Sequence, residues 1–451
     1  MDKKKISRRE FISKAGAAAA FTIVPRYVLG GPGHVPPSER LNVACIGVGG
    51  MGGADVGMVG RERDVNIVAL CDVDYKRGAS KFKAFPKAQK YKDFRVMLEK
   101  EHKNIDAVTV STPDHTHAVA AMAALKMNKH VYCQKPLAHD MFEVRALAEE
   151  ARKRGLATQM GVQIHARHEL KLGVEIIKSG MIGKVRKVDV WSCKGFGRPL
   201  DVIPKAKVPK MKIPDTLDWD LWLGPAPYRQ YHPQYVPAKW RRWWDFGSGR
   251  LGDMACHIID PVFWALDLKS PLTIEAHPDE FDQETYPLKT VVRWEFGARG
   301  DLPPVTMTWH DGFNKRNMPF LPKCTKSDFE LPDQGGLYYG EKGILLLPHV
   351  PSKKKPPVLL PLANMKDFKP PKQLFERGIN HYQEWIRACK NGAKTSTNFD
   401  YASLLTETAL LGNIAAKAGK RIFWDADKFE ITNMPNANQY LKREYRKGWT
   451  L

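Results

Sequence analysis

Residues 41–52 read LNVACIGVGGMG, and this stretch decides the fold. The apolar run Leu41 to Ile46 predicts a buried strand, and it leads directly into a turn of the form G-x-G-x-x-G, after which the sequence suits a helix. In this context Gly47 permits a tight turn, Gly49 lets the backbone approach a pyrophosphate, and Gly52 allows close packing of helix on strand. An ordinary tight turn is the alternative. The stretch predicts a dinucleotide site with its phosphate at the helix N-terminus.

An acidic residue supports this interpretation. Asp72 follows the second predicted strand, Asn66 to Cys71, and lies 25 residues after Gly47. At that distance a carboxylate accepts hydrogen bonds from the adenosine ribose. The same charge would repel the extra phosphate of NADP, although Lys76 and Arg77 would offset part of the repulsion, so we expect NAD. The contacts predicted in this region are Gly47, Gly49, Gly50, Met51, Gly52 and Asp72.

Short strands and helices alternate from Leu41 to Leu137, as they do in a parallel sheet covered by helices. The pattern predicts three further strands and a helix before residue 163. The strands are Ala107 to Ser111, His130 to Cys133 and Ala157 to Val162, and the helix is Ala118 to Lys126.

The pattern changes after Gln163. A helix is predicted at His168 to Ser179, and alternating apolar positions predict strands of a largely antiparallel sheet. These strands are Val185 to Trp191, Val291 to Phe296 and Val305 to Trp309. Two helices, 379–389 and 401–418, close the chain.

We therefore predict an α/β protein with two domains. Residues 1–37 form a signal and linker, and residues 38–162 form a Rossmann dinucleotide-binding domain. Residues 163–451 form a substrate domain with a large, mostly antiparallel open sheet, and its C-terminal helices pack back on the first domain.

Length and composition agree with two folded domains. The chain has 451 residues, and because domains usually have ~100 to 200 residues, two are expected. Hydrophobic residues make up 43% and charged residues 27%, which excludes a disordered chain. The apolar run Ala15 to Val24 covers only ten residues, whereas ~20 are needed to cross a bilayer, so no stable membrane association is expected.

The chain is basic, with a formal charge of +22 from 71 Lys and Arg against 49 Asp and Glu. Such a charge is typical of nucleic-acid-binding proteins, but no zinc-finger spacing or other nucleic-acid motif is present. We interpret the excess as solvated basic surface, part of which would face an anionic cofactor, and expect no nucleic-acid partner.

The N-terminus resembles a twin-arginine export signal. Arg8 and Arg9 precede the short apolar run Ala15 to Val24. An ordinary basic helix start is the alternative. Because this pathway carries folded proteins, we expect a periplasmic or extracytoplasmic protein that leaves the cytoplasm with its cofactor already bound.

Three cysteines, Cys45, Cys71 and Cys133, lie inside predicted strands, so we expect buried free thiols rather than disulfides. No C-x-x-C or Cys/His spacing is present. The two histidines of the stretch STPDHTHA, residues 111–118, lack Cys or Glu at ligand spacing, and no metal is expected.

The same stretch follows a strand at the edge where open parallel sheets bind ligands. We expect its hydroxyl and backbone groups to line the cofactor, through Ser111, Thr112, Pro113, His115 and His117. The next strand ends in Gln134, Lys135 and Pro136. Taken alone, a lysine at this place is an ordinary surface charge.

In residues 252–260, GDMACHIID, Asp253 and His257 are four residues apart. On a helix they would share one face, where a carboxylate orients an imidazole and raises its basicity. An ordinary surface pair is the alternative.

Together, G-x-G-x-x-G, STPDHTHA and the K-P motif resemble the Gfo/Idh/MocA family of oxidoreductases over roughly residues 40 to 440. The resemblance implies an NAD(P)-dependent enzyme of two domains that acts on sugars, cyclitols or glycosides. It implies catalytic roles for Lys135, Asp253 and His257, and a place near the active site for Gln163 and His165, for which helix-start capping is the alternative. The family's usual E-K-P is Q-K-P here, with Gln134 at the acidic position and Lys135 beside the nicotinamide.

The aromatic segment before the Asp253 motif suits a sugar platform. Trp240, Arg241 and Trp243 are its candidates, with core packing as an equal alternative. We expect hydride transfer between a sugar or glycoside carbon and a tightly held NAD. A redox-neutral NAD-dependent glycosidase and a non-catalytic dinucleotide or sugar sensor are the alternatives. A dimer or tetramer formed through the C-terminal sheet is also expected.

Overall fold

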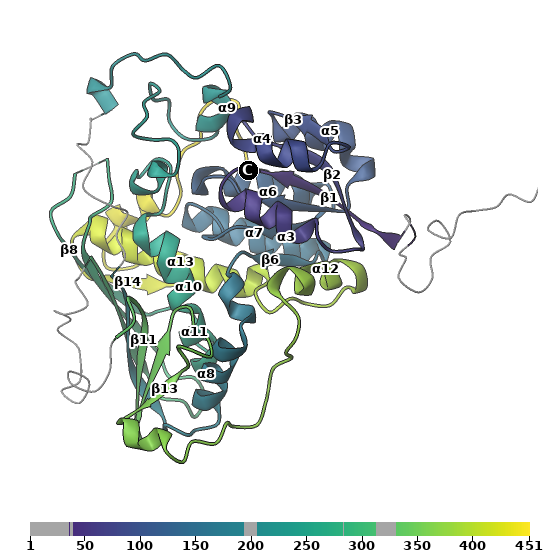
Figure 1. The fold of residues 1–451 in the computed structure, drawn as a ribbon. Helices are drawn as coiled ribbons and strands as arrows, with labels where there is room; N and C mark the ends of the chain where they lie inside the picture. Colours follow the sequence, from purple (N-terminus) through teal and green to yellow (C-terminus); the bar gives the residue numbers. More distant parts are fainter. Residues whose placement is uncertain (1–35, 37–38, 194–204, 283, 313–330) are drawn as a thin grey trace, which may run out of the picture.

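The computed structural model describes residues 36, 39–193, 205–282, 284–312 and 331–451. It contains a six-stranded sheet and a nine-stranded sheet, and helices pack around and between them (Figure 1). The predicted α/β fold class is confirmed. The predicted signal segment lies outside the described residues, apart from residue 36.

The first sheet is parallel throughout and has the strand order β3-β2-β1-β4-β5-β6. Its strands are β1 (Leu41–Ile46), β2 (Val65–Cys71), β3 (Gln89–Tyr91), β4 (Ala107–Val110), β5 (His130–Cys133) and β6 (Thr158–Met160). Ile46 pairs with Cys71 on one side and with Val110 on the other. This register brings the residues that follow β1, β2 and β4 to one edge of the sheet, as predicted.

Helices cover this sheet because each apolar strand must bury both faces. They are α3 (Met51–Val59), α4 (Tyr75–Ala84), α5 (Phe94–Glu101), α6 (Asp114–Lys126) and α7 (Met141–Arg154). Helix α6 begins at Asp114, four residues before the prediction, because Pro113 is extended and places Asp114 in the first turn. Helix α7 begins with a capping box formed by Asp140 and Glu143.

The second sheet has the order β13-β12-β11-β7-β10-β9-β8-β14-β15. Its strands are β7 (Val185–Ser192), β8 (Thr273–Pro278), β9 (Thr290–Phe296), β10 (Val305–Asp311), β11 (Gln334–Gly340), β12 (Ile344–Pro348), β13 (Val358–Leu360), β14 (Ile422–Asp425) and β15 (Glu430–Ile431). All neighbouring pairs are antiparallel except β7 and β10. The predicted strands in β7, β9 and β10 agree to within two residues, and β8 and β11 to β15 were not predicted individually.

The remaining helices join the two sheets. They are α8 (His168–Lys178), α9 (Trp219–Leu223), α10 (Cys256–Ile258), α11 (Asp260–Leu266), α12 (His381–Asn391) and α13 (Phe399–Ala418). Short 3-10 segments are η2 (His102–Asn104), η3 (Gln163–Ala166), η4 (Lys205–Lys207), η5 (Lys239–Arg242), η9 (Leu362–Met365) and η10 (Pro435–Tyr440), and η6 (Leu251–Ala255) is a π-helical turn. The predicted boundary after residue 162 falls between β6 and η3.

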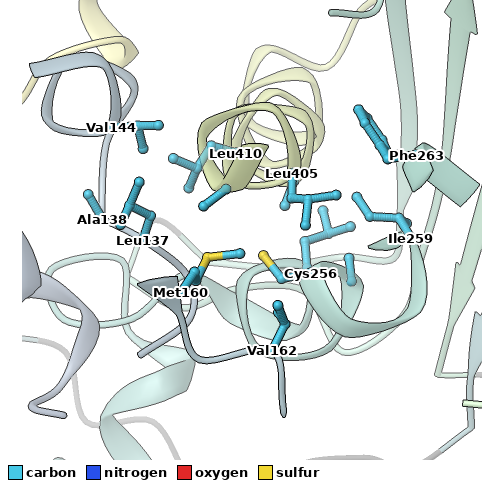
Figure 2. Packing of buried hydrophobic residues seen from close by; sticks show 14 of the residues in the cluster. Leu137, Ala138, Val144, Met160, Val162, Cys256, Ile259, Phe263, Leu405 and Leu410 are labelled. Atoms are coloured by element: carbon cyan, nitrogen blue, oxygen red, sulfur yellow. The ribbon is translucent and has the colours of Figure 1, made fainter. Parts of the chain in front are cut away.

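Helix α13 lies between the two sheets and contacts α7 on one side and β8 on the other. Figure 2 shows Leu405 and Leu410 of this helix between Leu137 and Met160 of the first domain and Ile259 of the second. These residues belong to one buried cluster. Helix α13 therefore joins the hydrophobic cores of both domains.

Candidate active site

A cavity of about 490 Å³ lies at the carboxyl edge of the first sheet. Its wall includes the glycine turn, Asp72 and Arg77, and it also includes Lys135 and His257. Residues 217–241 supply a further part of the wall. This segment is held against the first domain by hydrogen bonds from the backbone N–H of Tyr75 to the Thr216 carbonyl and from that of Asp218 to the Val73 carbonyl.

The glycine turn is too crowded for side chains. Gly47 has φ +77, and a Cβ there would lie 2.7 Å from the Ser111 carbonyl oxygen. A Cβ at Gly52 would lie 1.9 Å from the carbonyl oxygen of Gly47. The backbone of the turn therefore comes close to the cavity and ends at the N-terminus of α3. This arrangement fits the pyrophosphate of a dinucleotide. Gly49, Gly50 and Met51 also line the cavity.

Asp72 fixes the turn from the neighbouring strand. Its Oδ2 accepts hydrogen bonds from the backbone N–H groups of Val48 at 2.9 Å and Gly49 at 3.1 Å, and its Oδ1 accepts from Asp74 at 2.9 Å. Burial raises the pKa of Asp72, and these three hydrogen bonds lower it. Arg77 lines the same end of the cavity, and no hydrogen bond or ion pair joins its guanidinium to another described residue. Asp72 and Arg77 therefore place opposite charges where the adenosine ribose would bind.

The loop after β4 and the start of α6 line the cavity, but only some of the residues that do so were predicted from the sequence. Ser111, Thr112 and Pro113 line it, together with Asp114 and Thr116. The His115 ring instead lies between the Phe246 and Trp222 carbonyls, and the His117 ring lies between the Pro136 and Thr112 carbonyls. Both histidines are buried and do not line the cavity. This placement corrects the prediction that they contact the cofactor: they hold neighbouring loops in place.

Lys135, at the end of β5, forms an ion pair inside the cavity wall. Its Nζ lies 2.6 Å from Oδ1 of Asp253, which also accepts a hydrogen bond from Nε of Arg241 at 3.1 Å. Burial opposes ionisation of Asp253, but the two cations lower its pKa below the ordinary value. Asp253 does not itself line the cavity, whereas Lys135 and Arg241 do. The carboxylate therefore anchors both cations from behind.

His257 lines the cavity on the Lys135 side. Its Nδ1 is buried and has no hydrogen-bond partner among the described residues, which leaves Nε2 as the nitrogen available to a ligand. Burial lowers the pKa of His257 well below the ordinary value, and the Lys135 charge lowers it further. Both effects favour the neutral imidazole.

The geometry corrects the predicted pairing of Asp253 with His257. Asp253 lies in the π-helical turn η6 and His257 in α10, so the two do not follow one regular helix. The hydrogen bonds of the carboxylate go to Lys135 and Arg241. Asp253 therefore orients the lysine rather than the histidine. Its charge acts to raise the pKa of His257 as expected, but burial and the Lys135 charge outweigh that effect.

Gln134 and Gln163 both line the cavity. Nε2 of Gln163 donates to the Tyr132 hydroxyl at 2.9 Å. His165 instead points into the core, where its Nδ1 lies 2.9 Å from Asp260 and its ring stacks on Trp264 at 3.9 Å. His165 does not line the cavity, which corrects its placement near a substrate.

Of the three candidates in the aromatic segment, two line the cavity and one lies in the core. Trp240 and Arg241 line the cavity, and the Arg241 guanidinium lies 4.3 Å from the centre of the Trp240 ring. Trp243 is buried in an aromatic cluster and donates from Nε1 to the Gln234 carbonyl, so it does not reach the cavity. Core packing, the alternative for this segment, applies to Trp243.

Asp114 is the main cavity residue that the sequence interpretation missed. It is buried in the first turn of α6 and lines the cavity. Burial raises its pKa, while the charges of His117, Arg241 and Lys135 lower it. Its position in the PDHTH stretch was the available signal, since an acidic residue after an extended proline suits a helix start facing the sheet edge.

Further features concern ligands and thiols. The six cysteines in the described residues are free, and Cys45, Cys71 and Cys133 are buried as predicted. In the part of the chain that the structure describes, no three His, Cys, Asp or Glu side chains are grouped to hold a metal ion. None of the helices described there is long and apolar enough to cross a membrane.

Family models match both halves of the chain. Residues 41–162 match the oxidoreductase family NAD-binding Rossmann fold, and residues 167–298 match the C-terminal alpha/beta domain of the same family. The cofactor prediction of NAD is thereby confirmed.

Curated relatives match part of the chain. The myo-inositol 2-dehydrogenase of Thermotoga maritima is 28% identical over 163 residues, which are 36% of this chain and 48% of that protein. A glycosyl hydrolase family 109 protein of Shewanella pealeana is 24% identical over 205 residues, which are 40% of this chain and 44% of that protein. The chain thus spans about half the length of these relatives.

Solved structures share the fold over a greater length. The WlbA dehydrogenase of Bordetella pertussis, in complex with NADH and UDP-GlcNAcA, has a TM-score of 0.59 and 14% identity, over 86% of this chain and all of that chain. At this identity the likeness concerns the fold. The two family models, from one family and together covering more than half of the residues, show that the chain belongs to the Gfo/Idh/MocA family of oxidoreductases.

Proposed function

We propose that the protein is an NAD-dependent oxidoreductase that acts on a hydroxyl-bearing carbon of a sugar, cyclitol or glycoside. The observation that carries the proposal is that Lys135 and His257 line the same cavity as the glycine turn. A lysine, a neutral histidine and a dinucleotide-binding turn in one cavity suit alcohol oxidation, in which a proton and a hydride leave together. The myo-inositol 2-dehydrogenase relative supports a polyhydroxylated substrate.

In this proposal Lys135 donates a hydrogen bond to the reacting hydroxyl oxygen and stabilises the negative charge that develops on it. Asp253 holds the ammonium group in place at 2.6 Å. Nε2 of His257 accepts the hydroxyl proton, because the ring is neutral and its other nitrogen is buried. Bound NAD would supply the hydride acceptor. Trp240 and Arg241 offer an apolar face and hydrogen-bond donors to the remainder of a sugar.

The test is a panel of polyols, aldoses and glycosides incubated with the purified protein and NAD, with formation of NADH followed by absorbance and products identified by mass spectrometry. We expect NADH and a keto or lactone product from at least one polyhydroxylated compound. Lys135→Ala protein serves as the control. Product formation that is equally fast in this control, or no turnover with any compound, would contradict the proposal.

A redox-neutral glycosidase is the second candidate, and the Shewanella pealeana relative favours it. Such an enzyme would oxidise a hydroxyl of a glycoside, eliminate the aglycone, add water across the resulting double bond and return the hydride. The same residues could serve, since the proton and hydride steps occur at one cavity. A glycoside that releases its aglycone without net NADH would identify this activity, whereas a dehydrogenase of free sugars reduces one NAD to NADH for each sugar that it oxidises.

We also propose export with the cofactor bound, on the basis of the Arg8 and Arg9 motif. Periplasmic protein should then contain NAD at near-stoichiometric occupancy by mass spectrometry, and an Arg8→Lys, Arg9→Lys variant should stay in the cytoplasm. Recovery of folded but empty periplasmic protein would contradict cofactor retention.

For assembly we propose a dimer or tetramer through the nine-stranded sheet, which light scattering with cross-linking of that sheet would test.

A further inference from the structure

Asp55 of α3 is a buried carboxylate outside the catalytic group described above. It has an exposed fraction of 0%. Three side chains from separate parts of the fold donate hydrogen bonds to it. The Ser111 hydroxyl lies 2.7 Å from Oδ2, the Tyr382 hydroxyl lies 2.7 Å from Oδ1, and Nε2 of Gln134 lies 3.1 and 2.9 Å from the two oxygens.

All three donors are neutral groups, and no ion pair joins Asp55 to a cation within the described residues. Burial raises the pKa of Asp55 above its ordinary value, and the hydrogen bonds from Tyr382, Ser111 and Gln134 offset only part of that rise. A carboxylate that only accepts is satisfied in its ionised form by such donors. The charge is therefore held by dipoles and not cancelled by a neighbouring cation.

This carboxylate lies directly behind the cavity wall. Asp55 does not line the cavity, but its donors Ser111 and Gln134 do. Gln134 directly precedes Lys135, so the part of the wall that contains Gln134 is on the Lys135 side of the cavity. Asp72 lies at the end where the adenosine would bind. A dinucleotide whose pyrophosphate lies at the glycine turn and whose ribose lies at Asp72 would extend its nicotinamide toward this wall.

We propose that Asp55 is a positioning residue that fixes Gln134 and Ser111 in the cavity wall and biases the bound cofactor toward its oxidised form. The oxidised nicotinamide ring is cationic and the reduced ring is neutral. A negative charge that no cation cancels, held behind Ser111 and Gln134 of the cavity wall, would stabilise the first and leave the second nearly unaffected. The inference rests on NAD binding and is independent of which sugar reacts.

The arrangement also explains the departure from E-K-P. A glutamate at position 134 would place a second carboxylate against Asp55, and two like charges at hydrogen-bond distance in a buried site oppose each other strongly. Gln134 replaces that repulsion with an amide donor. The residues at positions 55 and 134 therefore depend on each other, because only one of the two can carry a negative charge at this wall without strong repulsion.

The test measures binding of NAD⁺ and of NADH, separately and without any sugar, by calorimetry on protein stripped of its cofactor. In Asp55→Asn protein we expect the affinity for NAD⁺ to fall by ~10-fold relative to that for NADH, which corresponds to about 1.4 kcal/mol. If Asp55 had only a structural role, Asp55→Asn would weaken the binding of NAD⁺ and of NADH by the same factor. Equal changes, or an unchanged ratio, would overturn the proposal.

Tyr382→Phe is the matched control, because it removes one hydrogen bond from Asp55 and keeps the charge. We expect lower stability with an unchanged ratio of the two dissociation constants. Circular dichroism checks that each variant is folded. If Asp55→Asn does not fold, Asp55→Ser removes the charge in its place.

A charge-relocation experiment tests the coupling independently. Gln134→Glu alone should destabilise the protein, and the double variant Asp55→Asn with Gln134→Glu should recover stability, since an amide again faces a carboxylate. The double variant should also recover the preference for NAD⁺, because the negative charge is restored to the wall. A double variant that binds the two forms in the same ratio as Asp55→Asn would show that the charge does not act on the cofactor. Because no substrate is present, failure here is distinguishable from failure of the proposed oxidation.

Discussion

At the residue scale, the Lys135 ammonium stays at the cavity because Asp253 compensates for two cations. Lys135 and Arg241 both bind Oδ1 of Asp253. Without that carboxylate the two cations would repel each other, and nothing would hold Lys135 in the position that the proposed reaction requires. The pair is partly shielded from water, with exposed fractions of 13% and 19% for its side chains, so screening by salt is incomplete.

The first prediction concerns the reacting groups. Lys135→Ala or His257→Ala should reduce turnover by roughly 10²-fold to 10⁴-fold, the usual scale for a positioned acid or base. NAD binding should survive, because the glycine turn is untouched. Turnover is followed by single-turnover absorbance and binding by calorimetry. Wild-type turnover in either variant would remove that residue from the mechanism.

The second prediction concerns the choice between NAD and NADP. Asp72 should disfavour the extra phosphate, since like charges at ~4 Å cost on the order of 4 kcal/mol at an effective dielectric of 20. Arg77 lines the same end of the cavity and offsets part of that cost. Arg77→Ala should therefore weaken NADP more than NAD when both dissociation constants are measured. Tighter binding of NADP than NAD by the unaltered protein would show that Asp72 does not select the cofactor.

At the element scale, two short elements determine the site geometry. The turn between β1 and α3 contains glycines because its backbone contacts the loop after β4. The π-helical turn η6 runs directly into α10, and its wider turn alters the angular spacing of Asp253 and His257 from that of a regular α-helix. It leaves the carboxylate behind Lys135 and the imidazole at the cavity, so one short segment supplies two different functions.

The third prediction tests the glycine turn. Gly52→Ala would place a Cβ 1.9 Å from the Gly47 carbonyl, so the turn must open. We expect a loss of about 1–3 kcal/mol of stability, as for other overpacked sites, together with at least ~10-fold weaker NAD binding. The control is Gly57→Ala in the same helix, where the new Cβ would meet only the end of the Lys81 side chain. This variant should be neutral or stabilised by up to about 1 kcal/mol. Similar effects at both positions would contradict the steric argument.

At the scale of the whole molecule, polar groups are buried where the two domains and the aromatic segment meet. His115 joins α6 to residues Trp222 and Phe246, and His381 of α12 joins the Met160 carbonyl. Burial lowers the pKa of each of these histidines to about 3, below the usual value of 6.5. Burial therefore favours the neutral ring at both positions. Neutral His381 donates from Nε2 to the Met160 carbonyl and accepts at Nδ1 from Gln159, whereas neutral His115 can donate to only one of its two carbonyls.

The fourth prediction follows from these pKa values. Between pH ~6.5 and ~3 the unfolded chain binds protons that the folded chain excludes, so the free energy of unfolding falls as the pH is lowered. Each such histidine contributes up to about 1.4 kcal/mol per pH unit in this range. Urea unfolding at several pH values gives the free energy of unfolding at each pH. The slope of this free energy against pH should be smaller in His115→Gln protein than in the unaltered protein. The control is His277→Gln, since His277 has a side-chain exposed fraction of 67%. An unchanged slope for the His115 variant would contradict the argument.

The sequence by itself determined the first domain and the edge at which it binds the dinucleotide. The strand before Gly47, the carboxylate at Asp72 and the loop from Ser111 are local patterns, and the parallel register of β1, β2 and β4 follows from them. The position of Lys135 at the same edge follows for the same reason. Most strands of the second sheet were harder to predict because Gly, Pro and Tyr interrupt their alternation, as in β11.

Only the tertiary structure decided the partners of the polar groups. Lys135 and Asp253 are 118 residues apart, and Asp55 and Tyr382 are 327 residues apart. Local patterns reveal that a side chain is polar, but its partner depends on which elements the fold brings together, because a buried charge takes the nearest group that satisfies it. For this reason His115, His117, His165 and Trp243 entered the core, Asp253 paired with Lys135 rather than with His257, and Asp55 came to lie behind the cavity wall.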